Sequence, residues 1–157
     1  MKAELISIGT ELLLGEIVNT NSSYIASQLP DIGIDLYYIS TVGDNRQRIL
    51  DTLRQAWQRS DIIITTGGLG PTQGDITRDT IAEFFNEEMS IDQILAQQIR
   101  ELFQLHNLEM TPNNIKQASI IPSAQIIDNG KGTAPGWWIE PAMRDRLRYV
   151  CRWCDLW

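Results

Sequence analysis

Cysteine and histidine, on which many catalytic and metal sites depend, are scarce in this sequence of 157 residues. The two cysteines, Cys151 and Cys154, form one C-x-x-C pair near the end of the chain. With no second pair and no histidine beside them, they supply half of a zinc site at best, so we interpret them as incidental thiols. The one histidine, His106, has no cysteine, aspartate or serine at a recognisable catalytic spacing. Histidine-based catalysis is therefore not indicated.

Long apolar runs and an excess of basic residues are also missing. No stretch of eighteen apolar residues occurs, so we expect no membrane-spanning helix. The opening MKAELISIGT lacks the apolar core and cleavage site of a secretion signal. Twenty acidic residues against 13 basic ones give a net charge of −7, whereas a nucleic-acid groove needs a basic face. We expect a cytoplasmic protein that binds neither membranes nor nucleic acid.

The apolar residues, 43% of the chain, are arranged in alternating strand-like and helix-like segments. The run DIIITT has no polar side, as expected of a strand covered on both faces of a parallel sheet. The alternation of elements predicts one α/β domain with a mostly parallel sheet. We expect strands at 3–8, 34–42 and 61–66, helices at 19–30, 46–59, 76–85, 91–106 and 113–118, and a strand or hairpin region up to 140.

Two of the expected helices have a recognisable apolar face. The spacing of helix 46–59 is typical of a helix that lies on a sheet. Helix 91–106 shows a similar periodicity. We expect the following side chains to point inward: Ile49, Leu50, Leu53, Ala56 and Trp57 in the first helix, and Ile91, Ile94, Leu95, Leu102 and Phe103 in the second.

Glycine and carboxylate residues follow each of the three expected parallel strands. Gly9, Thr10 and Glu11 follow the first, Gly43, Asp44 and Asn45 the second, and the loop TTGGLGPTQGD, Thr65 to Asp75, the third. Ligands of open α/β sheets bind outside the carboxyl ends of the strands. Glycine lets backbone N–H groups approach phosphate oxygens, and carboxylates hold hard cations such as Mg²⁺. The hydroxyl groups of Thr65, Thr66 and Thr72 belong to the same rim.

The same residues also have simpler interpretations. Asp44 is a good helix N-cap, Gly9 and Gly43 can serve only to turn the chain, and Glu11 can be solvated. The loop is neither a Walker A motif, since it lacks GK[ST], nor a GxGxxG motif. From the residues alone, the prediction is an anion-binding α/β domain, with metal assistance left open.

Four ordered motifs, IGTELLLGEIVNTNSSYIASQL, TVGDNRQRI, SDIIITTGGLGPTQGDITRD and NGKGTAPG, closely resemble one family. This is the N-terminal domain of the competence/damage-inducible protein A (CinA) family, which has the molybdopterin-binding fold of MogA- and MoaB-type proteins. The resemblance covers residues 2–138. It implies a three-layer α/β/α fold at 1–140, with an atypical or truncated tail at 141–157, and a homo-oligomer.

The resemblance also implies a site. Asp44 and Asp75 match the functional acid pair of the molybdopterin branch. In CinA-type proteins the domain is associated with cleavage of pyrophosphate bonds in nucleotides such as ADP-ribose, with Mg²⁺, Mn²⁺ or Co²⁺. We expect these two acids to be catalytic and metal-binding, and the ligand to be a nucleotide or pterin diphosphate. The expected ligand-binding residues are Gly9, Thr10, Glu11, Thr66, Gly67, Gly68, Gly70, Thr72, Thr77, Gly132 and Gly136.

The chain departs from the family pattern in three places. Gly74 stands where CinA relatives usually have a second acid, which leaves open a non-hydrolytic molybdopterin-binding module or an incomplete, inactive relative. The chain ends at Trp157, so we expect no nicotinamide mononucleotide deamidase domain. The tail lacks the family's next apolar strand. Two alternatives stay open for it, an altered or truncated terminus and a short basic amphipathic helix, whose spacing is carried by Met143, Leu147, Val150, Cys151 and Cys154.

Overall fold

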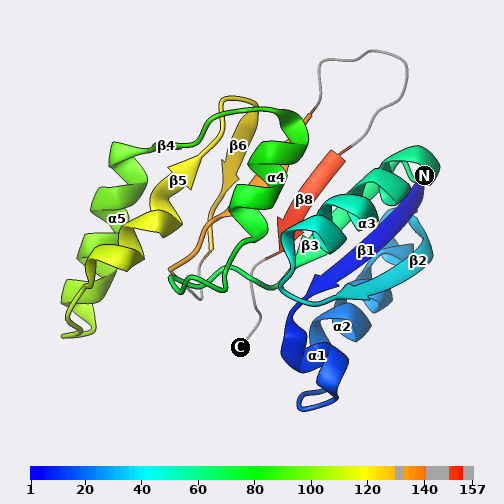
Figure 1. Ribbon diagram of the computed structural model, residues 1–157, viewed down its shortest axis with the longest axis horizontal. Helices are drawn as coiled ribbons and strands as arrows, with labels where there is room; N and C mark the ends of the chain where they lie inside the picture. The colour runs from blue at the N-terminus through cyan, green and yellow to red at the C-terminus, as the bar shows by residue number, and fades with distance from the viewer. Residues whose placement is uncertain (130–132, 141–148, 154–157) are drawn as a thin grey trace.

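The computed structural model describes residues 1–129, 133–140 and 149–153. Its centre is a six-stranded sheet with the order β2-β1-β3-β8-β7-β6, covered by helices on both faces (Figure 1). The expected α/β/α layers are thus confirmed. The sheet strands are β1 (Lys2–Ile8), β2 (Asp35–Val42), β3 (Ile62–Thr66), β6 (Ala124–Ile127), β7 (Gly136–Ile139) and β8 (Tyr149–Trp153).

The strands β1, β2, β3 and β8 are parallel to one another. On the other side of β8, β7 is antiparallel to β8, and β6 at the edge of the sheet is antiparallel to β7. A separate pair, β4 (Ser90–Ile91) and β5 (Ser119–Ile120), is antiparallel. The helices are α1 (Thr10–Leu14), α2 (Thr20–Gln28), α3 (Arg46–Arg59), α4 (Thr77–Phe85) and α5 (Gln93–Leu105), with 3-10 turns η1 (Pro30–Ile32) and η2 (Pro112–Ala118). Because β1, β2 and β3 run in the same direction, their carboxyl ends meet at one edge.

The core lies on both faces of the sheet. On one face, α3 and α4 pack against β1 and β3 through side chains such as Leu53, Ile81 and Ile63. On the other face, Ile25 of α2 packs against the opposite side of the same strands. Every residue of β3 is buried, as the apolar run DIIITT predicted. The helix α5 packs separately against η2, in a smaller cluster.

The structure corrects sequence predictions in two parts of the fold. Residues 149–153 form a strand between β3 and β7 instead of part of an amphipathic helix. The remaining residues of that predicted helix lie outside the described part of the chain. Two residues of the predicted helix 91–106 were expected to point inward and do not: Ile94 of α5 is 73% exposed, and Ile91 lies in β4, before the helix, and is 39% exposed. This helix packs on the narrow surface of η2, so only part of its apolar face is covered.

At the amino end of the sheet, the fully buried carboxylate of Glu4 is held by four hydrogen bonds. Its Oε1 accepts from Arg59 Nη2 (2.7 Å) and Ser40 Oγ (2.9 Å). Its Oε2 accepts from Arg59 Nε (2.9 Å) and Ser60 Oγ (3.3 Å). The Arg59 guanidinium lies 3.8 Å from the centre of the Tyr38 ring. The hydrogen bond to Glu4 raises the pKa of Arg59, against the opposing effect of burial.

Candidate functional site

The carboxyl edge of the sheet brings the three predicted junctions together. Gly9, after β1, donates its N–H to Val42 O at the end of β2 (2.9 Å). Gly67, after β3, lies so close to β1 that an added Cβ would stand 2.0 Å from Ile8 O. Gly67 also has a φ of 93°, which favours glycine. The sequence needs glycine here because the backbone after β3 must pass directly over the end of β1.

Asp44 is joined to Thr10 across two strand ends. Its Oδ2 accepts from Thr10 N (2.8 Å) and Thr10 Oγ1 (2.9 Å), and its own N–H donates to Thr10 Oγ1 (3.1 Å). The alternative that Asp44 caps α3 is wrong, because Asn45 fills that position and accepts from Arg48 N. The carboxylate of Asp44 is therefore held at the edge of the sheet.

Asp75 has a similar arrangement within the glycine-rich loop. Its Oδ2 accepts from Thr72 N (2.8 Å) and from Thr72 Oγ1 (2.5 Å). In both Asp44 and Asp75, one oxygen accepts from the N–H and the hydroxyl of a threonine. No hydrogen bond from any described residue reaches Oδ1 of either side chain. Each carboxylate is positioned by the protein and keeps an oxygen for another group.

Buried side chains of α4 hold the same loop in place. Thr77 Oγ1 donates to Gly67 O (3.0 Å), so this predicted ligand residue has a contact within the protein. Arg78, which the sequence analysis did not select, donates to Leu69 O and Pro135 O, both at 3.4 Å. Arg78 thereby links the loop to the segment just before Gly136, the first residue of β7. The sequence signal that could have singled out Arg78 was its place in the motif ITRD. Gly132 lies outside the described residues.

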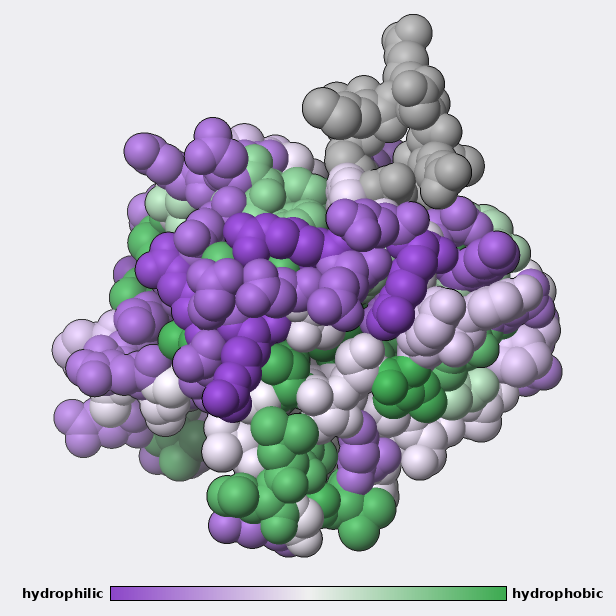
Figure 2. All heavy atoms as spheres, turned by 45° about the vertical axis from the view of Figure 1, so that its right-hand side comes forward, coloured by the Kyte–Doolittle hydropathy of each residue, from purple (hydrophilic) through white to green (hydrophobic). Residues whose placement is uncertain are grey.

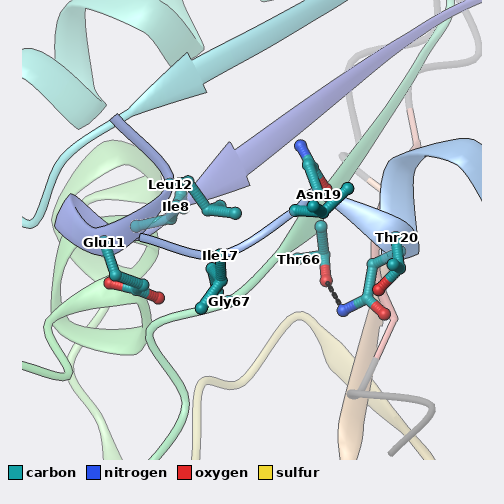
Figure 3. Close-up of a pocket in the computed structure, with 10 residues that line it drawn as sticks. Ile8, Glu11, Leu12, Ile17, Asn19, Thr20, Thr66 and Gly67 are labelled. Carbon is teal, nitrogen blue, oxygen red and sulfur yellow. Dashed lines mark hydrogen bonds between the residues drawn. The ribbon is translucent and has the colours of Figure 1, made fainter. Parts of the chain in front are cut away.

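A cavity of about 270 Å³ opens beside β1, β3 and the start of α2 (Figure 3). Three of the predicted site residues line it: Glu11, Thr66 and Gly67. Asp44 and Asp75 are not among the lining residues. The structure thus brings together part of the predicted set around the cavity and places the two aspartates elsewhere on the same edge. The cavity is lined by Ile8, Glu11, Leu12, Ile17, Val18, Asn19, Thr20, Asn21, Thr66 and Gly67.

Several lining residues were missed by sequence reasoning. Asn19 is the N-cap of α2, where its side chain accepts from Ser22 N (3.1 Å). Asn21 Nδ2 donates to Thr66 Oγ1 (3.3 Å), as Figure 3 shows. This contact joins positions far apart in the chain, so local spacing carries no signal for it. The aliphatic wall comes from α1 and the segment that follows it.

The acids of the described residues do not form a conventional metal cage. No group of three or more histidine, cysteine, aspartate or glutamate side chains in that part of the chain is placed to hold a metal ion. Magnesium is commonly bound by one or two carboxylates together with substrate phosphates. The Oδ1 atoms of Asp44 and Asp75, to which no residue in the described ranges donates, suit that second type of site, in which the ligand supplies the remaining oxygens.

Comparison with known proteins identifies the family. The model of a probable molybdopterin binding domain matches residues 4–145. The chain belongs to this family. It is 51% identical over 140 residues to a putative competence-damage inducible protein of Clostridium beijerinckii, covering 89% of this chain and 34% of that protein. The chain therefore spans about a third of the length of the curated relatives it matches.

Solved structures support the same assignment. The CinA protein of unknown function from Thermoplasma acidophilum is 30% identical, with a TM-score of 0.86 over 99% of this chain and 88% of that one. The tungsten cofactor synthesizing protein MoaB from Pyrococcus furiosus is 20% identical, with a TM-score of 0.58 over 98% and 81% of the chains, and shares the fold. The chain is CinA-like, as its motifs predicted. No helix in the described ranges is long and apolar enough to cross a membrane.

Proposed function

We propose that this domain binds a nucleotide or pterin diphosphate, with molybdopterin as an alternative ligand, at the carboxyl edge of its sheet. The observation that carries the proposal is the cavity beside Glu11, Thr66 and Gly67, directly adjoining the glycine-rich loop. Small-molecule sites are concave, with mostly apolar walls and a few placed polar groups. This cavity has that character, and it lies where ligands of open α/β sheets bind.

The loop supplies donors suited to phosphate oxygens. The N–H groups of Gly68 and Gly70 donate to no acceptor among the described residues, and both glycines are half-buried. Gly68 has a φ of 63°, and its Cα faces the buried Thr77 hydroxyl, where no side chain fits. Fixed backbone N–H groups of this kind bind anions without needing a basic side chain.

The start of α2 supports binding of an anion at the same edge. Thr20 and Asn21, in its first turn, line the cavity. The amino end of a helix carries a partial positive charge and N–H groups that point away from the helix. This feature offsets part of the negative charge of the nearby carboxylates.

Hydrolysis of a pyrophosphate bond with Mg²⁺, Mn²⁺ or Co²⁺ is a second candidate function. The observation that favours it is the unbonded Oδ1 of both Asp44 and Asp75. A bound cation would neutralise charge on the diphosphate and activate water. The two aspartates would hold it, and the loop N–H groups would orient the phosphates. Gly74 stands where CinA relatives usually have a second acid, and this difference concerns hydrolysis. The proposal for binding does not depend on hydrolysis.

Calorimetric titration of the purified chain separates these functions. We expect ADP-ribose or a pterin diphosphate to bind, and addition of each metal to strengthen binding. Release of AMP from ADP-ribose with any of the three metals supports the hydrolytic function. Tight binding, or retained pterin fluorescence, without turnover supports the binding module alone. A folded chain that binds none of these ligands, with or without metal, contradicts both functions.

We also propose that the chain forms a homo-oligomer. Exposed apolar side chains gather at the lower end of the molecule, over α1 and the segment after it (Figure 2). Leu14 and Val18 are 67% and 81% exposed. Contiguous exposed apolar surface is typical of an interaction site. Light scattering should give a mass that is a multiple of 17.8 kDa, and Leu14→Gln should lower it. A monomer at all concentrations contradicts this proposal.

A further inference from the structure

Glu11 is the only charged side chain among the described residues that line the cavity. Its carboxylate lies against Gly9, where an added Cβ would be 2.4 Å from Oε1, so glycine leaves room for it. No described residue donates a hydrogen bond to this carboxylate. Figure 3 shows the side chain reaching from α1 towards the same side of the cavity as Gly67. Glu11 is thus an exposed acceptor at the mouth of a ligand-sized space, and no hydrogen bond from the described part of the chain reaches its carboxylate.

Three of the other four polar side chains that line the cavity, those of Asn19, Asn21 and Thr66, form hydrogen bonds within the fold. Asn19 donates to Ser7 Oγ (2.9 Å) and accepts from Ser22 N. Asn21 and Thr66 are bonded to each other. These groups are held in place and help to shape the cavity. Of the lining polar side chains, those of Glu11 and Thr20 form no hydrogen bond with any described residue, and Glu11 is the charged one of the two.

A carboxylate repels phosphate unless a cation or a donor stands between them. No basic side chain lines this cavity among the described residues. The phosphates are therefore better placed at the N–H groups of Gly68 and Gly70, and the uncharged part of the ligand beside Glu11. The aliphatic walls from Ile8 and Leu12 suit the flat, weakly polar face of a ring.

We propose that Glu11 selects the ligand by accepting hydrogen bonds from two adjacent donors on its uncharged part. This inference rests on the proposed binding function. Two chemical groups offer such a pair of donors: the vicinal hydroxyls of a ribose, and the ring N–H with the amino group of a 2-amino-4-oxopyrimidine, as in guanine and pterins. Hydrogen bonds to an ionised acceptor are about twice as strong as neutral ones. Glu11 therefore fixes the direction in which the ligand lies.

The test compares wild type with Glu11→Gln by calorimetry, using four probes: inorganic pyrophosphate, GDP, 2′,3′-dideoxy-GDP and IDP. Glutamine keeps the size of the side chain and removes the charge. We expect the substitution to weaken GDP binding about tenfold. Pyrophosphate, which has no uncharged part, should bind the variant as well as wild type or better. Glu16→Gln, on the neighbouring exposed segment outside the cavity, is the matched control and should change neither affinity.

The remaining probes identify the donor pair. If the effect of Glu11→Gln is lost with dideoxy-GDP, the ribose hydroxyls face Glu11; if it is lost with IDP, the amino edge of the base does. Equal weakening of pyrophosphate and GDP would overturn the inference, because Glu11 would then act through a cation or the fold. No change with any probe would also overturn it. A wild-type chain that binds none of the four probes instead refutes the underlying binding function.

Discussion

The carboxylates at the two ends of the sheet differ in how completely the protein satisfies them. At the amino end, Glu4 is buried and accepts four hydrogen bonds, two of them from Arg59. At the carboxyl end, Asp44 and Asp75 each accept from one threonine and keep Oδ1 unbonded by the described residues. The Glu11 carboxylate accepts no hydrogen bond from any described residue.

This difference separates structural charge from charge that is open to a ligand. A buried carboxylate must be paired and hydrogen-bonded, or it destabilises the fold. Glu4 meets that condition with its own neighbours and has no capacity for a ligand. At the other end Glu11 is exposed and Asp44 and Asp75 are half-buried, so water reaches these carboxylates until a ligand or cation binds. Substitutions at the two ends should therefore affect different properties: stability at the amino end and binding at the carboxyl end.

The largest expected effect is at the amino end. Arg59→Met leaves the buried Glu4 carboxylate with only its two serine donors, and should lower the free energy of unfolding by about 3 kcal/mol. Urea denaturation measures this change. The matched control on the same helix is Arg54→Met, which removes an exposed pair with Asp51 and should cost at most about 1 kcal/mol. Equal effects of the two substitutions would contradict the structural role assigned to Glu4.

An intermediate effect is expected in the glycine-rich loop. Gly68→Ala adds a side chain to a residue whose backbone is in the left-handed conformation, and it places the new Cβ 2.2 Å from Thr77 Oγ1. We expect a loss of about 2 kcal/mol, together with weaker ligand binding. Gly33→Ala is the control: its φ of 71° is similar, but nothing lies within 4 Å of the added Cβ. It should cost about 1 kcal/mol and leave binding unchanged. Equal ligand affinities for both variants would argue against the loop as a phosphate site.

The smallest effect on stability is expected at Asp75. Asp75→Asn keeps an oxygen that can accept from Thr72, so the free energy of unfolding should change by about 0.5 kcal/mol or less. Metal-linked ligand binding and any AMP release should be lost, because the negative charge is removed. Asp51→Asn, an exposed acid on α3, serves as the control. Unchanged metal-linked binding in Asp75→Asn would remove this residue from the site.

Local patterns predicted those elements whose apolar spacing is long and regular. The helix at Arg46–Arg59 and the buried strand Ile62–Thr66 were both anticipated. The strand β8 has only five residues, Tyr149–Trp153, too few for periodicity to decide between helix and strand. Its pairing with β3 is a long-range contact, which local patterns do not show. Ile94 was misplaced because spacing shows that a helix has an apolar face without showing what covers it.

The candidate site was predictable only at the level of the sheet edge. The position of ligands at strand ends is a general property of the fold, so the sequence placed Glu11, Thr66 and Gly67 at this edge, and all three line the cavity. Their role in binding a ligand stays a prediction. Asn21 was not, because its significance depends on Thr66, 45 positions away. Arg78 stands in the motif ITRD, but its contacts with the backbone carbonyl groups of Leu69 and Pro135 depend on the folded chain, so the motif marks the residue without showing what it does.

The most direct test of the central claim is to record amide NMR spectra of the isotope-labelled chain during titration with ADP-ribose, pyrophosphate and GDP. Binding at the carboxyl edge predicts the largest shifts at Gly67, Gly68 and Gly70, with little change around Glu4 and Arg59. Shifts centred on the amino end, or no shifts with any of these ligands, would contradict the account.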